Sequence, residues 1–434
     1  MFKKLLSKNV VEILWLCSGQ VISMLLGIVS IKLLTSMGPN EFGKYSLVLS
    51  VAALVSAVFY GPAEQGFVRF YYDYSNRGVA STFLKVLYLF LILAGCGCLV
   101  LTVLAFIANN IFGKWEQTSV VIISGLYITL SVSVNIFNSF LNLLRKRKAN
   151  TILQVVERCL CIGLIYILFN NKSLSFLTAL AALSVAIIIV LILKISMLNT
   201  FVPADDETDS KILANSRNEI VRVVKKFSIP FGIWGVTGWM QSSSERWVIA
   251  HYLTTADVGI YALMITIANY IIAMPCGIIG QFVLPLIYKR VSSTDEKLRK
   301  EAFKIMNYLI ISTATLVICA SIITALFGRQ TILLLGGSKY TDFWYLLPVL
   351  CIGTGLFHVG QSFTTFGMLL NVPDKYILPK VASGIIAVLS NIVLISFFGM
   401  LGISLSICFT SLAYLLLVIF INSRIKSEFV NCIV

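Results

Sequence analysis

The sequence predicts an all-α integral membrane protein in which twelve transmembrane helices form two six-helix lobes related by pseudo-two-fold symmetry. Three observations lead to this prediction: 58% of the 434 residues are hydrophobic and only 12% are charged, the apolar residues gather in long runs, and a short motif recurs half a chain apart. Soluble domains contain about 25% charged residues. This low charge and the mean hydropathy of +0.92 disfavour soluble enzymes, disordered chains and nucleic-acid-binding proteins, because none of these leaves so much apolar surface without surrounding lipid.

The N-terminal half contains six apolar runs, each with the roughly 20 residues needed to cross a bilayer. Charged or Gly/Pro-rich breaks separate the runs. The first follows three lysines, as in a signal peptide, but it continues without a small-residue cleavage site, so we interpret it as a retained span. Residues 1–198 are expected to form the N-terminal lobe, with spans at 10–36, 43–61, 82–107, 117–143, 152–170 and 174–198.

A polar stretch separates the two halves. Within residues 199–225, four acidic residues at 205–209 are followed by a mainly basic stretch, and we expect a solvated cytoplasmic linker or an amphipathic surface helix there. Residues 226–434 are expected to form the C-terminal lobe with a short cytoplasmic tail. Its spans are expected at 226–246, 257–284, 304–327, 343–369, 377–398 and 400–421.

The positions of the basic residues predict the orientation of the chain. The sequence has 34 Lys and Arg against 19 Asp and Glu, a net charge of +15. With a cytoplasmic N-terminus, 24 of the 34 basic residues fall on cytoplasmic segments, six on the opposite side and four within spans. Because Lys and Arg concentrate on the cytoplasmic side of membrane proteins, both termini are expected in the cytoplasm. The excess of basic residues is therefore explained by the orientation of the chain in the membrane, and it gives no reason to expect nucleic acid as a partner.

An internal repeat coincides with the division into two halves. Residues 41–47 (EFGKYSL) and 257–263 (DVGIYAL) share the pattern acidic-x-Gly-x-Tyr-small-Leu at a separation of 216 residues, close to half of the chain. Each copy precedes the second span of its half, which indicates a duplication. Six spans per copy is an even number, so the two lobes share one orientation. The predicted symmetry axis lies along the membrane normal, with a cavity between two bundles as is typical of transporters.

Ionisable side chains inside the expected spans are candidates for function, because each costs about 2.5–3.5 kcal/mol at a helix centre. Lys32, late in span one, either faces a cavity or snorkels to the interface. Glu157 and Arg158 are adjacent in span five and point about 100° apart, so at least one needs an interhelical partner, functional or structural. Lys85 and Lys194 lie near cytoplasmic helix ends and are interpreted as snorkelling.

Further charged residues lie where spans end. Glu245 and Arg246 close span seven in a serine-rich stretch, which fits either a water-filled cavity or an interfacial anchor. Glu64 and Arg69 follow a Gly-Pro break after span two, whose exposed backbone is tolerable only against protein or water. The segment after this break could form the entrance of a cavity that admits a polar headgroup, or it could belong to an aromatic belt at the membrane interface. His358 in span ten is interpreted as a packing residue, with a proton relay as the alternative.

The sequence contains none of the motifs of nucleotide hydrolysis or of common hydrolytic enzymes. Walker A, HExxH and GxSxG patterns are all lacking, which argues against an ATP-driven pump and against an enzyme. The ten cysteines lie almost entirely within apolar runs and contain no CxxC pair, so we interpret them as small buried apolar residues. We therefore expect no catalytic residue, no metal site and no cofactor.

Several segments carry a family resemblance. Residues 36–46 (SMGPNEFGKYS) resemble the LGPxEFGxYS segment of the polysaccharide transport, or O-antigen flippase, family of the multidrug/oligosaccharidyl-lipid/polysaccharide exporter superfamily. Arg69 fits the Arg that follows span two in that family. Glu245-Arg246 with residues 257–261 is similar to its DR…VGIYS pattern, here with Glu for Asp and Ala262 for Ser. Asn391 with residues 399–402 looks like its closing N…GxxG pattern, so the likeness covers residues 10–421.

The resemblance implies a MATE-like fold and the translocation of undecaprenyl-pyrophosphate-linked oligosaccharide from the cytoplasmic to the periplasmic leaflet of a bacterial inner membrane. A diphosphate needs cations in its path, and a gradient of H⁺ or Na⁺ would supply a drive where no nucleotide site exists. Four basic residues are candidates for a cationic cavity, namely Lys32, Arg69, Arg158 and Arg246. Three acidic residues are candidates for ion coupling, namely Glu64, Glu157 and Glu245.

Two other functions remain open at this point. A multidrug/cation antiporter of the same superfamily would favour an acidic cavity, which the basic candidates oppose. A membrane-embedded oligosaccharide polymerase, a glycosyltransferase, would need a large periplasmic loop, whereas the longest one expected covers only residues 328–342. For a flippase, the expected partners besides the lipid-linked substrate are membrane lipids and, in the same pathway, a polysaccharide polymerase and a chain-length regulator.

Overall fold

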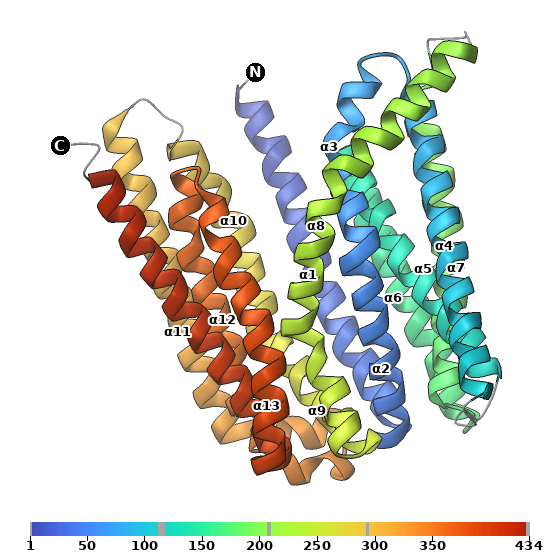
Figure 1. Ribbon diagram of the computed structural model, residues 1–434, viewed down its shortest axis with the longest axis vertical. Helices are drawn as coiled ribbons and strands as arrows, with labels where there is room; N and C mark the ends of the chain where they lie inside the picture. The colour runs from blue at the N-terminus through green and yellow to red at the C-terminus, as the bar shows by residue number, and fades with distance from the viewer. Residues whose placement is uncertain (1, 112–117, 206–209, 292–294, 431–434) are drawn as a thin grey trace. The chain divides into compact units, whose positions relative to one another are not determined.

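The chain is helical throughout the described residues of the computed structural model, which are 2–111, 118–205, 210–291 and 295–430 (Figure 1). Within these described ranges, ten stretches of helix are long and apolar enough to cross a membrane. One of these, α13 (Ile377–Val430), is two helices joined at Gly399, and the 43-residue α8 (Ser210–Tyr252) is a further long helix of lower hydropathy. The described part of the chain thus supplies the twelve predicted spans, which confirms the predicted fold class.

The helices form two compact units, each with its own core. The first comprises residues 1–37 and 47–236, and the second comprises residues 38–46 and 237–434. The boundary at Val236 lies inside α8, so residues 210–225 of the expected linker belong to a long helix that continues into span seven. The other end of the expected linker is also helical, because α7 (Phe176–Phe201) extends into it.

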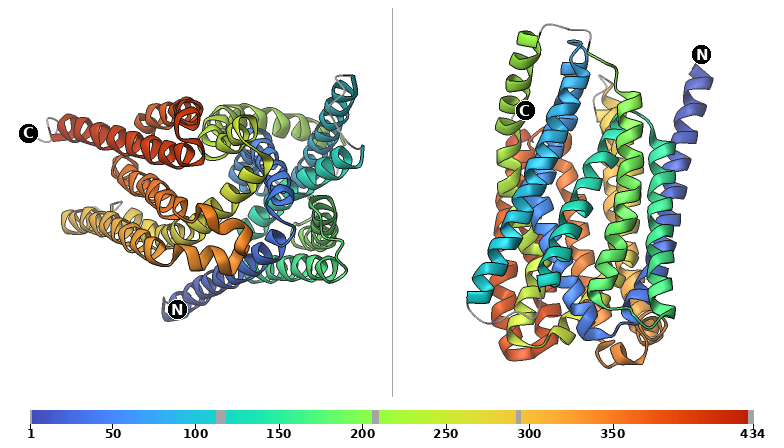
Figure 2. Two further views of the ribbon diagram at one scale, coloured as in Figure 1. Left: turned by 90° about the horizontal axis from the view of Figure 1, so that it is seen from below. Right: turned by 90° about the vertical axis from the view of Figure 1, so that its right-hand side faces the viewer.

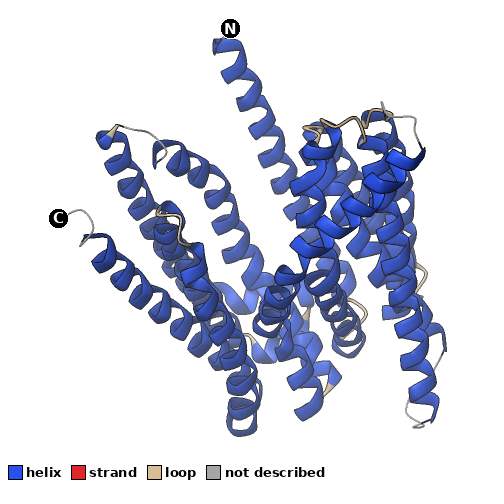
Figure 3. Ribbon diagram, turned by 45° about the horizontal axis from the view of Figure 1, so that its top comes forward, coloured by secondary structure: helices blue, strands red, loops and turns tan. Residues whose placement is uncertain are grey.

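In the first unit, long helices run side by side (Figure 2). α1 packs on α6, and α5 packs on both α4 and α7. Turns of three to five residues join α3 to α4, α5 to α6 and α6 to α7, so the described backbone contains little irregular structure, as Figure 3 shows. The elements of this unit, besides parts of α2 and α8, are α1 (Phe2–Thr35), η1 (Ser56–Tyr60), α3 (Gly61–Ser75), α4 (Ala80–Ile111), α5 (Thr118–Leu143), α6 (Arg147–Asn170) and α7.

The second unit is built on the same plan. α12 packs on both α11 and α13, and α10 packs on α11. Its elements, besides parts of α2 (Pro39–Val55) and α8, are α9 (Thr255–Ala268), η2 (Asn269–Ala273), α10 (Met274–Val291), α11 (Glu296–Gly336), η3 (Ser338–Phe343), α12 (Leu346–Leu369), η4 (Pro373–Tyr376) and α13.

A π-helical turn lies in the middle of span two and again in the middle of span eight. The N–H of Gly61 bonds to the carbonyl of Ser56, and the N–H of Met274 bonds to the carbonyl of Asn269, both five residues back. A proline follows each turn, and the wider turn accommodates the ring that would otherwise clash with the preceding helical turn. The expectation that span two ends at the Gly-Pro break is therefore wrong, because helix continues through it to Ser75.

The two copies of the repeated motif contact each other within the second unit. A Cβ added at Gly43 would lie 1.9 Å from the carbonyl oxygen of Thr255, and one added at Gly259 would lie 1.9 Å from that of Pro39. The two contacts are equivalent, since Pro39 and Thr255 are separated by the same 216 residues as the two glycines. Only glycine permits two helix backbones to approach this closely. The duplicated motif thus makes a reciprocal helix crossing.

The last two spans form a hairpin at Gly399, whose φ of 56° is in the left-handed region. Across the hairpin, the Ser390 hydroxyl lies 2.5 Å from that of Ser406 and 3.3 Å from that of Thr410. The division expected between residues 398 and 401 is therefore correct. The hairpin brings polar side chains of two apolar helices together inside the second unit, next to the pocket described below.

Candidate functional site

The second unit encloses a polar pocket of about 270 Å³. Its walls come from the last part of α8, from α9 and η2, and from α12 and both halves of α13. The volume has room for roughly nine molecules the size of water. The polar and aromatic side chains that line it are Gln241, Ser242, Glu245, Tyr261, Asn269, Thr354, Phe357, His358, Lys380, Asn391, Ser406, Thr410 and Ser411.

Lys380 supplies the positive charge of this pocket. Its Nζ donates a hydrogen bond of 2.9 Å to Oε1 of Gln241 and lies 4.6 Å from the ring centroid of Phe357 and 5.9 Å from that of Tyr414. No carboxylate lies within ion-pair distance of Lys380 among the described residues. An ammonium group held only by an amide and two ring faces keeps most of its capacity to bind an anionic or hydroxyl-rich ligand.

Glu245 supplies the negative charge of the same pocket. It is only 3% exposed, and it lines the pocket together with Tyr261, whose hydroxyl is buried without a hydrogen-bond partner. Nearby, the amide nitrogen of Asn391 donates to Ser244 at 3.4 Å, while its Oδ1 is buried without a hydrogen-bond partner. This carboxylate shares the pocket with amide and hydroxyl groups, and such a set of groups can hold either a proton or a small hard cation.

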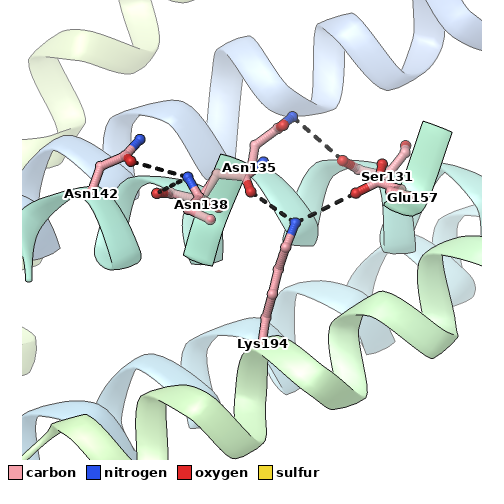
Figure 4. A network of polar contacts seen from close by, with 7 residues as sticks. Ser131, Asn135, Asn138, Asn142, Glu157 and Lys194 are labelled. Carbon is pink, nitrogen blue, oxygen red and sulfur yellow. Dashed lines mark hydrogen bonds and ion pairs between the residues drawn. The ribbon is translucent and has the colours of Figure 1, made fainter. Parts of the chain in front are cut away.

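A second polar cluster crosses the first unit along α5 (Figure 4). Lys194 of α7 is fully buried, and its Nζ donates to Oδ1 of Asn138 at 2.8 Å and lies 3.4 Å from Oε2 of Glu157. The amide of Asn150 donates to the Asn138 carbonyl at 3.2 Å and to Oδ1 of Asn142 at 3.0 Å. The expectation that Lys194 snorkels is wrong, because a counter-ion and an amide on neighbouring helices satisfy it inside the bundle.

The three acidic candidates occupy different places. Glu157 is the counter-ion of Lys194, and Glu64 accepts a hydrogen bond from Ser139 of α5, so both lie in the first unit and are held by neighbouring helices. Glu245 alone of the three lines the pocket of the second unit. The assignment of ion coupling to these residues stays a prediction.

The four basic candidates lie on four different helices. Lys32 on α1 and Arg158 on α6 are exposed, and Arg69 on α3 makes an exposed ion pair of 3.5 Å with Asp73. Arg246 lies beside the pocket, where its Nη1 donates to Ser243 at 3.4 Å and its Nε is buried without a partner.

Sequence reasoning missed most of the pocket. The count that predicts the orientation includes Lys380 among the 24 cytoplasmic basic residues, although Lys380 is the fourth residue of the span expected at 377–398. Gln241, a lone amide in span seven, was a second available signal. His358 lines the pocket, and its ring packs edge-on against Phe357. Both interpretations of His358, a packing residue and a proton relay, are compatible with this position.

These features define a multi-pass membrane protein with the two-lobe fold of the multidrug and lipid exporters. An inward-facing multidrug resistance MATE family transporter of the MOP superfamily superposes with a TM-score of 0.68 at 14% identity, covering 93% of this chain and 95% of the other. The lipid II flippase MurJ in an inward closed conformation gives 0.67 at 13% identity, covering 95% and 87%. A MOP superfamily transporter from Pyrococcus furiosus, described by the reverse polarity of its binding pocket, gives 0.56 at 14% identity and covers 96% of both chains.

The sequence itself identifies the family. The model of the polysaccharide biosynthesis protein family matches residues 10–291, which is more than half of the chain, and the chain belongs to that family. No curated protein is a significant match in sequence. The family resemblance that the motifs indicated is thus confirmed, and so is the MATE-like fold that it implied.

Proposed function

We propose that the protein is a flippase that moves an undecaprenyl-pyrophosphate-linked oligosaccharide, such as an O-antigen or similar surface polysaccharide repeat unit, from the cytoplasmic to the periplasmic leaflet by alternating access. Membership of the polysaccharide biosynthesis protein family and a transporter fold support this function. In this proposal the protein lies in a bacterial inner membrane with both termini in the cytoplasm, as the distribution of basic residues predicts.

The observation that carries the proposal is the charged pocket of the second unit. Ionisable groups within spans are costly and usually mark the path of a substrate or an ion. Here Lys380, the ring of Phe357 and the amides of Gln241 and Asn391 offer what a sugar or its phosphate requires, which is a ring face for stacking and donors for hydroxyl or anionic oxygens. In our proposal part of the oligosaccharide headgroup occupies this pocket during translocation.

Glu245 is the carboxylate that we propose for ion coupling. It shares the pocket with Lys380, so a proton or Na⁺ bound at Glu245 changes the charge that the headgroup meets. Glu64 and Glu157 are less suited, because Ser139 and Lys194 already engage them. The proposed contacts of the diphosphate remain the basic residues Lys32, Arg69, Arg158 and Arg246. The proposed protein partners are a downstream polysaccharide polymerase and a chain-length regulator.

Transport in liposomes tests the pocket. The purified protein is reconstituted with a fluorescent undecaprenyl-diphospho-oligosaccharide, and the fraction accessible to a membrane-impermeant quencher is followed over time. Lys380→Met is expected to slow translocation about tenfold or more, whereas Lys375→Met, which alters an exposed lysine on η4, is expected to leave it unchanged. Equal rates for both variants and the wild type would contradict the role of the pocket.

The alternative functions give different results in the same system. A multidrug antiporter would move a cationic dye and leave the lipid-linked oligosaccharide in place. A polymerase would lengthen the oligosaccharide, which mass spectrometry of the recovered lipid would reveal. Our proposal predicts translocation of the intact lipid-linked unit without elongation.

A further inference from the structure

An apolar groove of about 630 Å³ lies in the first unit, apart from the polar pocket of the second. It runs between α8, the α2–η1–α3 span and α4. The α8 residues that line it recur every three or four positions and so form one face of the helix. The lining residues of α8 are Val221, Val224, Lys225, Ser228, Ile229, Gly232, Ile233 and Val236.

The groove has the dimensions of a lipid chain. From Lys225 to Val236 a helix rises about 16 Å, which is about half of the roughly 30 Å hydrocarbon thickness of a bilayer. The volume has room for roughly twenty groups the size of a water molecule, to which a methylene group is comparable. The groove residues at its rim are well exposed, with Leu93 at 61% and Ile229 at 57%, so a chain can enter sideways.

Small residues give the groove its depth. Gly232 and Ser228 on α8 lie opposite Pro62 and Ala63 on α3. Towards its far end, α8 closes on η1, because a Cβ at Gly235 would lie 1.8 Å from the carbonyl oxygen of Ala57. The groove is therefore open along its side and bounded at one end by a backbone contact.

Among the described residues that line the groove, Lys225 alone is charged. In the predicted orientation it lies at the cytoplasmic boundary of span seven, and the apolar lining continues from it into the membrane. Lys225 is exposed and makes no ion pair among the described residues. The groove thus presents one cation at the headgroup level and one apolar channel below it, which is complementary to an anionic lipid with a single chain.

We propose that this groove holds the part of the lipid carrier's polyisoprenoid chain nearest the headgroup, in the cytoplasmic leaflet, with Lys225 beside the phosphate of that headgroup. The proposal rests on the proposed function, since it assigns a loading site for the tail of that substrate. A polyprenyl phosphate has one long chain, which fits a single groove. A glycerophospholipid has two chains, and one of them would remain outside the groove. The bound tail keeps the carrier beside the protein while the headgroup moves.

Photolabelling of the full chain in liposomes tests the groove without measuring transport. The probe is undecaprenyl monophosphate with a diazirine in its chain, and labelled peptides are identified by mass spectrometry. Labelling is expected on residues 58–67, 86–93 and 221–236. Leu93→Trp is expected to lower this labelling severalfold, whereas Ile92→Trp, at an equally exposed neighbour that does not line the groove, leaves it unchanged.

Charge variants give an independent arm of the test. Lys225→Ala is expected to weaken labelling about fivefold, and Lys226→Ala, at an exposed lysine outside the lining, is expected to leave it unchanged. Labelling spread evenly over exposed helix faces would overturn the proposal. So would labelling of the groove by a diazirine phospholipid that unlabelled undecaprenyl phosphate does not displace. Because the probe carries no sugar, groove labelling without oligosaccharide translocation would refute the proposed function alone, and translocation without groove labelling would refute the groove alone.

Discussion

Replacing Lys194 by Met removes the positive charge from the polar cluster of the first unit and keeps a side chain of similar length. In the native protein the ammonium group is fully buried, 2.8 Å from the Asn138 amide oxygen and 3.4 Å from the Glu157 carboxylate. The change leaves the carboxylate without its counter-ion and the amide oxygen without its donor. Glu157 is itself only 16% exposed, so water can compensate for little of this loss.

The size of the effect follows from that burial. Removing one partner of a buried ion pair costs about 3–5 kcal/mol, because an uncompensated charge remains in the interior. The residual exposure of Glu157 places our expectation near the lower end, at about 3 kcal/mol. The double variant Lys194→Met/Glu157→Gln contains neither charge and is expected to recover more than half of the loss, since a neutral pair of similar volume often replaces a buried ion pair without penalty.

The assay is the free energy of unfolding in detergent micelles, measured for both single variants and the double variant as a thermodynamic cycle. Lys85→Met, at an exposed lysine on α4, serves as the control and is expected to change stability by less than about 0.5 kcal/mol. A Lys194→Met protein as stable as the control would refute the structural role of the pair. Equally, a double variant as unstable as the sum of the single variants would show that the two charges do not interact.

Three further predictions concern other parts of the molecule. Gly43→Ala is expected to destabilise the protein by at least about 1–3 kcal/mol, because its Cβ would meet a backbone carbonyl, whereas Gly97→Ala, with open space around it, should be neutral or stabilising; thermal unfolding of the two compares them. Glu245→Gln is expected to abolish the response of transport to a proton or Na⁺ gradient while substrate binding persists, and a response of wild-type size would exclude Glu245 as the coupling group. Arg158→Ala is expected to lower transport about tenfold if this exposed cation contacts the diphosphate, and unchanged transport would remove it from the cationic path.

The span pattern and the duplication could be predicted from the sequence because they depend on local composition. Apolar runs of sufficient length identify membrane helices, and the repeated Gly-x-Tyr motif pointed to the duplication. What the motif does could not be read in advance: the contact between Gly43 and Gly259 is made by backbones of residues far apart in the chain. The π-helical turns were missed for a related reason, since a proline after a glycine predicts a break unless the preceding turn widens.

The polar sites were harder to predict, because burial depends on neighbouring helices. Lys194 near a helix end fits snorkelling until Asn138 and Glu157 are seen to face it from α5 and α6. Lys380 likewise fits the cytoplasmic end of its span until Gln241 on α8 is seen to accept its hydrogen bond. Glu245 was found because a carboxylate in a span is conspicuous on its own.

The most direct test of the central claim is the rate at which a fluorescent undecaprenyl-diphospho-oligosaccharide crosses between leaflets of liposomes that contain the purified protein. Protein-free liposomes give the background, and a cationic dye in the same liposomes gives the rate for a multidrug substrate. We predict rapid translocation of the lipid-linked oligosaccharide and background movement of the dye. Translocation of the oligosaccharide at the rate of protein-free liposomes would contradict the account.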